Sequence, residues 1–259
     1  MLRVSTDRVR QWLPVAAWLL LAAAIVALAL LALAGPAYRS GLLELSSAFG
    51  LFRYGAWTGL LVALLALPVA GLCLWLGRAH QSLAVALIAL LIGAISVGLP
   101  YSWLQKARSV PPIHDISTDT EEPPAFEAIA PLRADAPNPV AYAGEETARQ
   151  QREAYPDLET MILNVDRNTA VEAAVHVAQS MRWILVDVDA PEGRIEATAT
   201  TRWFGFKDDV VIRIRETTRG SELDIRSKSR VGRSDVGANA ERIREFRARL
   251  EARLQEDMP

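Results

Sequence analysis

The order of apolar and polar residues divides the chain into two unlike halves. Three long apolar runs, at about 12–34, 56–76 and 83–103, lie within residues 1–104. Each run is long enough to cross a hydrocarbon core of about 30 Å as a helix, so we expect a three-span membrane anchor. A cleaved signal peptide is the alternative for the first run, but this run exceeds the apolar length of such signals and further runs follow it.

Residues 105–156, which we call the strap, are rich in proline and poor in apolar periodicity. They hold eight of the fourteen prolines in the chain, and proline favours extended backbone. Such a segment is either a disordered tether or an ordered stretch that lies across the following domain. Scattered apolar residues, among them Ile113, Ile116 and Phe126, favour the ordered form for the first half of the strap, and the alternatives stay open for residues 134–154.

Residues 157–259 have the periodicity of an α+β domain. Val171, Ala174 and Ala178 recur at helical spacing after Asp166, a suitable N-cap, and a last helix is expected to begin near Val236. Strand candidates lie at 158–163, 183–189, 194–203, 208–216 and 222–230. Short glycine-containing turns join most of them, which predicts a mainly antiparallel sheet of about five strands with two helices on one face.

Alternation along the strands assigns the two faces of this sheet. The expected apolar face includes Ile184, Val186, Val188, Ile195, Ala197, Val210, Ile212, Leu223 and Ile225. The opposite face carries the charges. Trp183, Leu185 and Val211 fall on that polar face, so the strap or a partner protein should cover them.

Opposite charges predict the register of two hairpins. The expected pairs are Arg202–Asp209 and Glu196–Arg215 for a turn at 204–207, and Arg213–Asp224, Arg215–Glu222 and Asp209–Lys228 for a turn at 217–220. Cross-strand pairs of this kind contribute about 0.2–1 kcal/mol each. Most of the charge therefore has a structural role.

Two cations, Arg226 and Arg230, have no carboxylate directly opposite in this register. They precede the last helix, where free N–H groups and the helix dipole favour anions. We expect a site for phosphate, sulfate or a lipid headgroup there. Its candidate residues are Arg226, Arg230, Arg233, Ser234 and Asn239. The alternative is that the nearby aspartates Asp208, Asp209 and Asp235 neutralise these cations diagonally.

Charge and cysteine content exclude several classes of function. A net charge of -2 over 259 residues gives no reason to expect a nucleic-acid partner. The single cysteine, Cys73, allows neither an intramolecular disulfide nor a cysteine-based metal site. Asp115, Ser117 and Asp119 are spaced like the first ligands of a calcium-binding loop. The chain, however, lacks the glycine and the glutamate that such a loop requires at later positions. We expect no metal and no cofactor.

His114 beside Asp115 is an acid–base candidate, with Asp208 and Asp209 as further carboxylates. Adjacent residues on an extended chain point in opposite directions, however, and no nucleophile or nucleotide motif accompanies them. The leading hypothesis is a non-enzymatic binding or assembly module. The alternative is an envelope hydrolase in which His114 and an aspartate act on an anionic substrate held by Arg226, Arg230 or Arg233.

Several motifs together resemble the bacterial and plastid family known as domain of unknown function 1499 (DUF1499). They are PPIHDISTD at 111–119, AYPD at 154–157, TRWFGFKDD at 201–209 and DIRSKSRVGRSD at 224–235. The resemblance covers about residues 109–254. It implies that the strap belongs to an ordered domain in a membrane setting, and it transfers no catalytic residue.

The flanking charges of the first span predict orientation. Arg3, Arg8 and Arg10 precede it, which favours a cytoplasmic N-terminus and, after three spans, a periplasmic C-terminal domain at the inner membrane of a bacterium. The expected partners are the lipid bilayer, another membrane or envelope protein, and a small anion or lipid headgroup.

Overall fold

The computed structural model describes residues 6–77 and 79–256. The chain forms two compact units, Met1–Gln105 with Trp203–Gly205 and Lys106–Arg202 with Phe206–Pro259. Of the arginines that predict orientation, Arg3 and the side chain of Arg8 lie outside the described residues.

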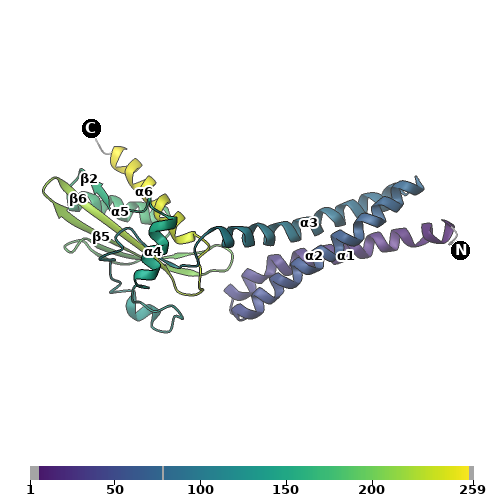
Figure 1. Cartoon of the computed structure of the whole chain (residues 1–259), viewed down its shortest axis with the longest axis horizontal. Coiled ribbons are helices and arrows are strands. Elements are labelled where there is room, and N and C mark those ends of the chain that lie inside the picture. Colours follow the sequence, from purple (N-terminus) through teal and green to yellow (C-terminus); the bar gives the residue numbers. More distant parts are fainter. Residues whose placement is uncertain (1–5, 78, 257–259) are drawn as a thin grey trace. The chain divides into compact units, whose positions relative to one another are not determined.

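The first unit contains the helices α1 (Thr6–Arg39) and α2 (Leu45–Leu76) and most of α3 (His80–Ser109) (Figure 1). All three are long and apolar enough to cross a membrane. Each extends beyond the apolar run that predicted it, because polar residues at the ends continue the helical backbone.

Small side chains allow these helices to pack closely. A Cβ atom added to Gly93 on α3 would lie 2.8 Å from the carbonyl oxygen of Gly59 on α2, so the two backbones meet there. Many of the buried apolar positions are alanines, including Ala17, Ala24, Ala66 and Ala89. Because lipid tails remove most of the hydrophobic drive for association, membrane helices depend on such close van der Waals packing.

The second unit is an α+β domain built on a six-stranded antiparallel sheet. The strands are β1 (Asp115–Ser117), β2 (Met161–Leu163), β3 (Ile184–Asp189), β4 (Arg194–Thr200), β5 (Lys207–Thr217) and β6 (Gly220–Ser229). Their order is β1-β6-β5-β4-β3, and β2 also pairs with β6. The prediction of an antiparallel sheet of about five strands is confirmed.

Helices α5 (Arg167–Ser180) and α6 (Ala238–Glu256) cover the apolar face of this sheet (Figure 1). Asp166 caps α5 as predicted, accepting hydrogen bonds from the backbone N–H groups of Asn168 and Thr169. The core contains Val171, Ala174, Ile243 and Phe246 from the helices and alternate residues of β4, β5 and β6.

The predicted register of the β5–β6 hairpin is confirmed, and the predicted register of the β4–β5 hairpin is wrong. Between β5 and β6, Arg213 lies opposite Asp224 and Asp209 opposite Lys228, as charge pairing predicted. Between β4 and β5, Glu196 lies opposite Val211 rather than Arg215. The turn falls two residues earlier than expected. The backbone N–H of Thr201 donates to the carbonyl oxygen of Phe206 and closes the turn, in which Gly205 takes the left-handed conformation at φ 71°.

The predicted faces of β3 are also wrong. Trp183 is buried and stacks on Phe246 at 5.5 Å, whereas Ile184 is 66% exposed. Val186 packs on the opposite face with Val211, and a register shift lies between Leu185 and Asp187. Side chains of a strand alternate between its two faces, so an alternation that is assigned one residue out of phase places every side chain on the wrong face.

The strap is ordered and contains three elements: β1, a 3-10 helix η1 (Ala130–Arg133) and the helix α4 (Glu145–Ala154). Phe126 and Ile129 pack on Val211, so the strap covers the apolar residue of the polar face as expected. Gln151 on α4 binds the backbone of Ser117 through both its amide oxygen and its amide nitrogen, at 3.0 and 2.6 Å. This amide thereby extends the hydrogen bonding of the edge strand β1.

Candidate functional site

Buried charges join the strap to the polar face of the sheet. Asp115 on β1 is fully buried and accepts hydrogen bonds from Arg226 at 2.9 and 3.0 Å and from Lys228 at 2.9 Å. Burial alone raises the pKa of the Asp115 carboxyl, but the hydrogen bonds and charges of Arg226 and Lys228 outweigh burial and hold that pKa below its usual value. Asp115 is therefore a structural counter-ion.

Arg226 is buried, and its guanidinium group contacts several residues of the strap. Its guanidinium carbon lies 4.9 Å from the ring centre of Phe126 and 5.3 Å from that of Tyr142, within cation–π range. It also donates to the carbonyl oxygens of Pro124 and Val140 at 3.1 and 3.0 Å. Four of its five N–H groups thus have acceptors within the protein.

Asp209 plays the same part for a second group of cations. It binds Arg230 through two hydrogen bonds of 2.9 and 2.8 Å, and the fully buried Arg133 of the strap lies 3.2 Å away. Lys228, which the register places opposite Asp209, binds Asp115 instead. The expectation that Arg226 and Arg230 lack carboxylate partners is therefore wrong, because their partners lie on the strap and along a diagonal.

Glu196 fixes the middle of the strap. Its buried carboxylate accepts hydrogen bonds from three consecutive backbone N–H groups, those of Glu127 and Ala128 at 2.8 and 3.1 Å and that of Ile129 at 2.8 Å. A carboxylate satisfied by three backbone donors is a strong local clamp. This contact explains why Glu196 is buried without an arginine directly opposite.

The start of α6 satisfies its own donors. Asp235 accepts from the N–H groups of Gly237 and Asn239 at 2.8 and 2.9 Å, and Ser234 accepts from that of Val236 at 3.1 Å. Burial raises the pKa of the Asp235 carboxyl, and these N–H bonds offset the rise in part. The N–H groups that the sequence offered to an external anion are thus occupied by the chain.

The remaining predicted residues do not converge on an open site. Asn239 is fully buried and bridges Ser227 and Ser229 at 2.7 and 3.1 Å. Arg233 is exposed, and its side chain forms no ion pair within the described part of the chain. Of the five candidates for the anion site, only Arg233 therefore presents a charge to solvent.

His114 has no acid–base partner among the described residues. Its Nδ1 atom lies 3.4 Å from the carbonyl oxygen of Arg233. The carboxylates of Asp115 and Asp209 bind the cations described above, and Asp208 binds Arg242 at 2.5 Å. The structure brings the four acid–base candidates into one domain without joining His114 to any carboxylate.

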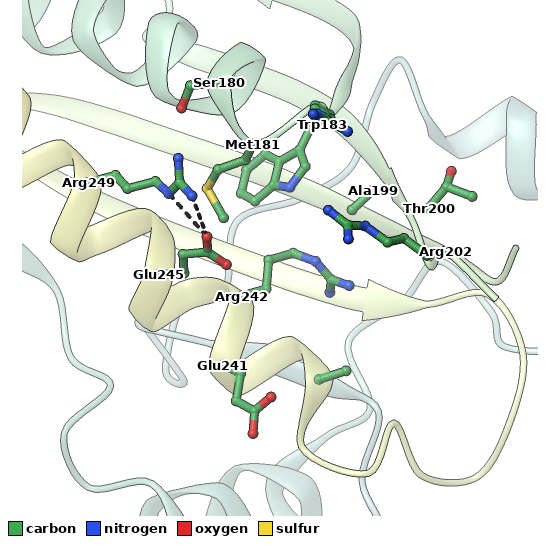
Figure 2. A pocket seen from close by; sticks show the side chains of 12 residues that line it. Ser180, Met181, Trp183, Ala199, Thr200, Arg202, Glu241, Arg242, Glu245 and Arg249 are labelled. Carbon is green, nitrogen blue, oxygen red and sulfur yellow. Dashed lines mark hydrogen bonds and ion pairs between the residues drawn. The ribbon is translucent and has the colours of Figure 1, made fainter. Parts of the chain in front are cut away.

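A separate pocket of about 580 Å³ opens beside α6, at the end of α5 and along β4 (Figure 2). We call it the arginine pocket. Its charged and large apolar lining residues are Arg182, Arg202, Arg242, Arg249, Glu241, Glu245, Met181 and Trp183. Four arginines against two glutamates give the lining a formal positive charge. Such a lining suits an anion, since arginine recognises carboxylates and phosphates through paired hydrogen bonds.

The α6 residues of the arginine pocket are held in place. Arg242 donates to Ser227 at 2.9 Å and to Asp208 at 2.5 Å, and it also binds the side-chain oxygen of Asn239. Arg249 binds Glu245 one turn away at 2.7 Å (Figure 2). In the same view the ring of Trp183 lies among Met181, Arg202 and Arg242. The pocket thus combines fixed cations with an aromatic floor.

Arg182 occupies a backbone position that normally belongs to glycine. It follows the end of α5 with φ 60°, in the left-handed region. Its N–H donates to Gln179 at 2.9 Å, and that of Trp183 donates to Ala178 at 3.0 Å, the paired bonds of a Schellman motif. A non-glycine residue bears a cost of about 1–2 kcal/mol there. The side chain of Arg182 is exposed and forms no ion pair within the described residues.

Sequence reasoning missed the arginine pocket. Arg242, Glu245 and Arg249 share one face of the predicted last helix, because they are three and four residues apart. This spacing was visible in the sequence, but it is also typical of an ordinary solvent-exposed helix face. The junction Met181-Arg182-Trp183 has no glycine between a helix and a strand. That missing glycine was the better signal.

The arrangement of donors limits what the domain can hold. Among the described residues there is no group of three or more His, Cys, Asp or Glu placed to bind a metal ion. Most of the charged residues that line the arginine pocket are cations, which repel metal ions and attract carboxylates, phosphates or sulfates.

Fold and site together define an α+β domain whose antiparallel sheet is sealed on its polar face by a strap, in a chain with three helices that could span a membrane. The chain belongs to the DUF1499 family of proteins of unknown function, whose model matches residues 115–250. The match begins at the first residue of β1, so residues 115–156 of the strap are part of the family domain. Among curated proteins no relative matches this chain.

Proposed function

We propose that the protein is a membrane-anchored binding module whose soluble domain binds an anionic ligand in the arginine pocket. The observation that carries this proposal is the excess of arginines around an aromatic floor in a pocket of about 580 Å³. The ligand is a carboxylate, phosphate or sulfate that also carries a planar or apolar group. The anion would bind the guanidinium groups, and the apolar group would pack on Trp183 and Met181.

The backbone of Arg182 supports the same function. Strained residues persist where the surrounding structure and the function both require them. A glycine would complete the end of α5 without strain, whereas an arginine adds a cation at the rim of the pocket. Its left-handed conformation is thus best explained by the side chain that it presents.

The cellular location and the membrane topology are part of this proposal. We place the chain in the inner membrane of a bacterium, with a cytoplasmic N-terminus and a periplasmic binding domain, because arginines precede the first span. The lipid bilayer and another membrane or envelope protein are the proposed partners. Protease added to spheroplasts should cleave the domain, and full protection would contradict this topology.

No observation favours the hydrolase alternative. The carboxylates of Asp115, Asp208 and Asp209 bind arginine or lysine side chains rather than a histidine. Among the residues lining the arginine pocket, Ser180 donates its hydroxyl hydrogen to the carbonyl oxygen of Val177 at 2.8 Å. These contacts are structural, and binding remains the better supported function.

Calorimetric titration of the full chain in non-ionic detergent tests the proposal, with phenyl phosphate as the probe. Arg182→Gln removes one pocket charge and should weaken binding about fivefold, since an exposed ion pair contributes up to about 1 kcal/mol. Arg219→Gln is the matched control, because Arg219 is exposed in the β5–β6 turn, outside the pocket lining. Equal binding by wild type and Arg182→Gln, or equal loss in both variants, would refute a specific site.

A further inference from the structure

The membrane unit contains a second pocket, of about 260 Å³, at one end of its three helices. We call it the interfacial pocket. Its lining includes Arg10, Leu13, Leu76, His80, Gln81 and Ser82. Arg10 begins the first candidate membrane span, Leu76 ends the second and His80 begins the third. The pocket therefore lies where all three candidate spans meet one edge of the hydrocarbon region.

Aromatic residues support this depth. Trp12 on α1 and Trp75 on α2 lie near this end, and these residues are 65% and 74% exposed. Exposed tryptophans concentrate at the level of lipid headgroups, because the ring is largely apolar and its N–H requires a polar partner. The interfacial pocket is thus at the level where phosphate groups of lipids are found.

The lining combines hydrogen-bond donors with an apolar wall. Arg10 supplies a guanidinium group and Gln81 an amide, and the first turn of α3 adds backbone N–H groups that lack intrahelical acceptors. Among the described residues that line the pocket there is no carboxylate. Leu13 and Leu76 provide the apolar surface.

Ser82 gives independent support for a ligand. Its side chain lines the interfacial pocket, only 7% of the residue is exposed, and its hydroxyl has no hydrogen-bond partner within the described part of the chain. A pocket-lining hydroxyl without a partner in the described protein is available to hydrogen-bond a ligand oxygen.

We propose that the interfacial pocket binds the phosphate group of an anionic phospholipid, with Arg10 and Ser82 as direct ligands. The phosphate oxygens accept hydrogen bonds from the guanidinium, the hydroxyl and the N–H groups that begin α3. The glycerol end and the first acyl methylenes pack on Leu13 and Leu76. The volume suits a headgroup better than a whole lipid, since it falls just below that of pockets for drug-sized ligands. This site is independent of the arginine pocket.

Native mass spectrometry of the delipidated full chain in non-ionic detergent tests the proposal, with phosphatidylglycerol, phosphatidylcholine and inorganic phosphate as probes. Wild type should bind one phosphatidylglycerol more tightly than phosphatidylcholine. Arg10→Gln should weaken phosphatidylglycerol binding at least about tenfold, because a hydrogen-bonded charge pair is lost. Ser82→Leu, which fills the pocket and keeps every charge, should weaken binding to a similar extent.

Arg53→Gln is the matched control. It removes one exposed cation from the early part of α2, away from the turn that joins α2 to α3. Its binding should stay within about twofold of wild type. Unchanged binding by Arg10→Gln or Ser82→Leu would overturn the proposal, as would an equal loss in Arg53→Gln. Displacement of the lipid by inorganic phosphate at equal concentration would assign the pocket to free phosphate instead.

Discussion

Replacing Arg182 with glycine separates backbone strain from ligand binding. The left-handed conformation at φ 60° costs an arginine about 1–2 kcal/mol. Glycine removes that cost but loses about 0.5–1 kcal/mol through the greater freedom of its unfolded chain. The net expectation is a stabilisation of up to about 1.5 kcal/mol, while binding of phenyl phosphate weakens about fivefold as in Arg182→Gln.

The assay is thermal unfolding of the full chain in non-ionic detergent, followed by near-ultraviolet circular dichroism of the aromatic side chains. A domain of this size gains about 2–4 °C in Tm for each kcal/mol. Arg182→Gly should therefore raise Tm by a few degrees, whereas Arg182→Gln should leave it nearly unchanged. A lower Tm in the glycine variant would show that the arginine side chain stabilises the fold, and would refute its assignment as a strained binding residue.

Three further predictions concern the strap. Asp115→Ala should lower the free energy of unfolding by about 3–5 kcal/mol in chemical denaturation, because it leaves Arg226 and Lys228 buried without a counter-charge; a loss below about 1 kcal/mol would contradict this. The pKa of Asp115 is lower in the folded than in the unfolded chain. The stabilisation that its carboxylate provides is therefore present above the unfolded pKa and is lost as pH falls through the folded pKa. Tm should decline below about pH 4 in wild type and less steeply in Asp115→Asn. Glu196→Ala should release residues 127–129 and speed limited proteolysis there at least about tenfold, while the exposed-site variant Glu192→Ala is cleaved like wild type.

Local patterns predicted most of the fold. The apolar runs indicated the three long helices, and alternating residues in β5 and β6 gave both strands and their register. That register was recoverable because Arg213–Asp224 and Arg215–Glu222 are pairs of opposite charge only in one alignment. Strand β3 was assigned to the wrong face because its residues are apolar on both sides, so period two has no unique phase.

The contacts of the strap could not be predicted from local patterns. Asp115 and Arg226 are separated by 111 positions, and neither residue carries a signal that identifies the other. Helix α4 was missed because it has few apolar residues, and it is attached through the polar side chain of Gln151. The arginine pocket could not be predicted from local patterns either, since Arg182 and Arg242 come from different elements that only the folded sheet brings together.

The position of β6 has a consequence for the order in which the domain is made. As the last strand synthesised, β6 is also the strand with which both β1 and β2 pair. A ribosome therefore releases β1 about a hundred residues before its partner exists. Until then Asp115 has no counter-charge and the strap has no surface to cover. Long-range pairing of this kind gives a high contact order and slow folding, so the nascent domain is exposed to chaperones and proteases until β6 closes the sheet.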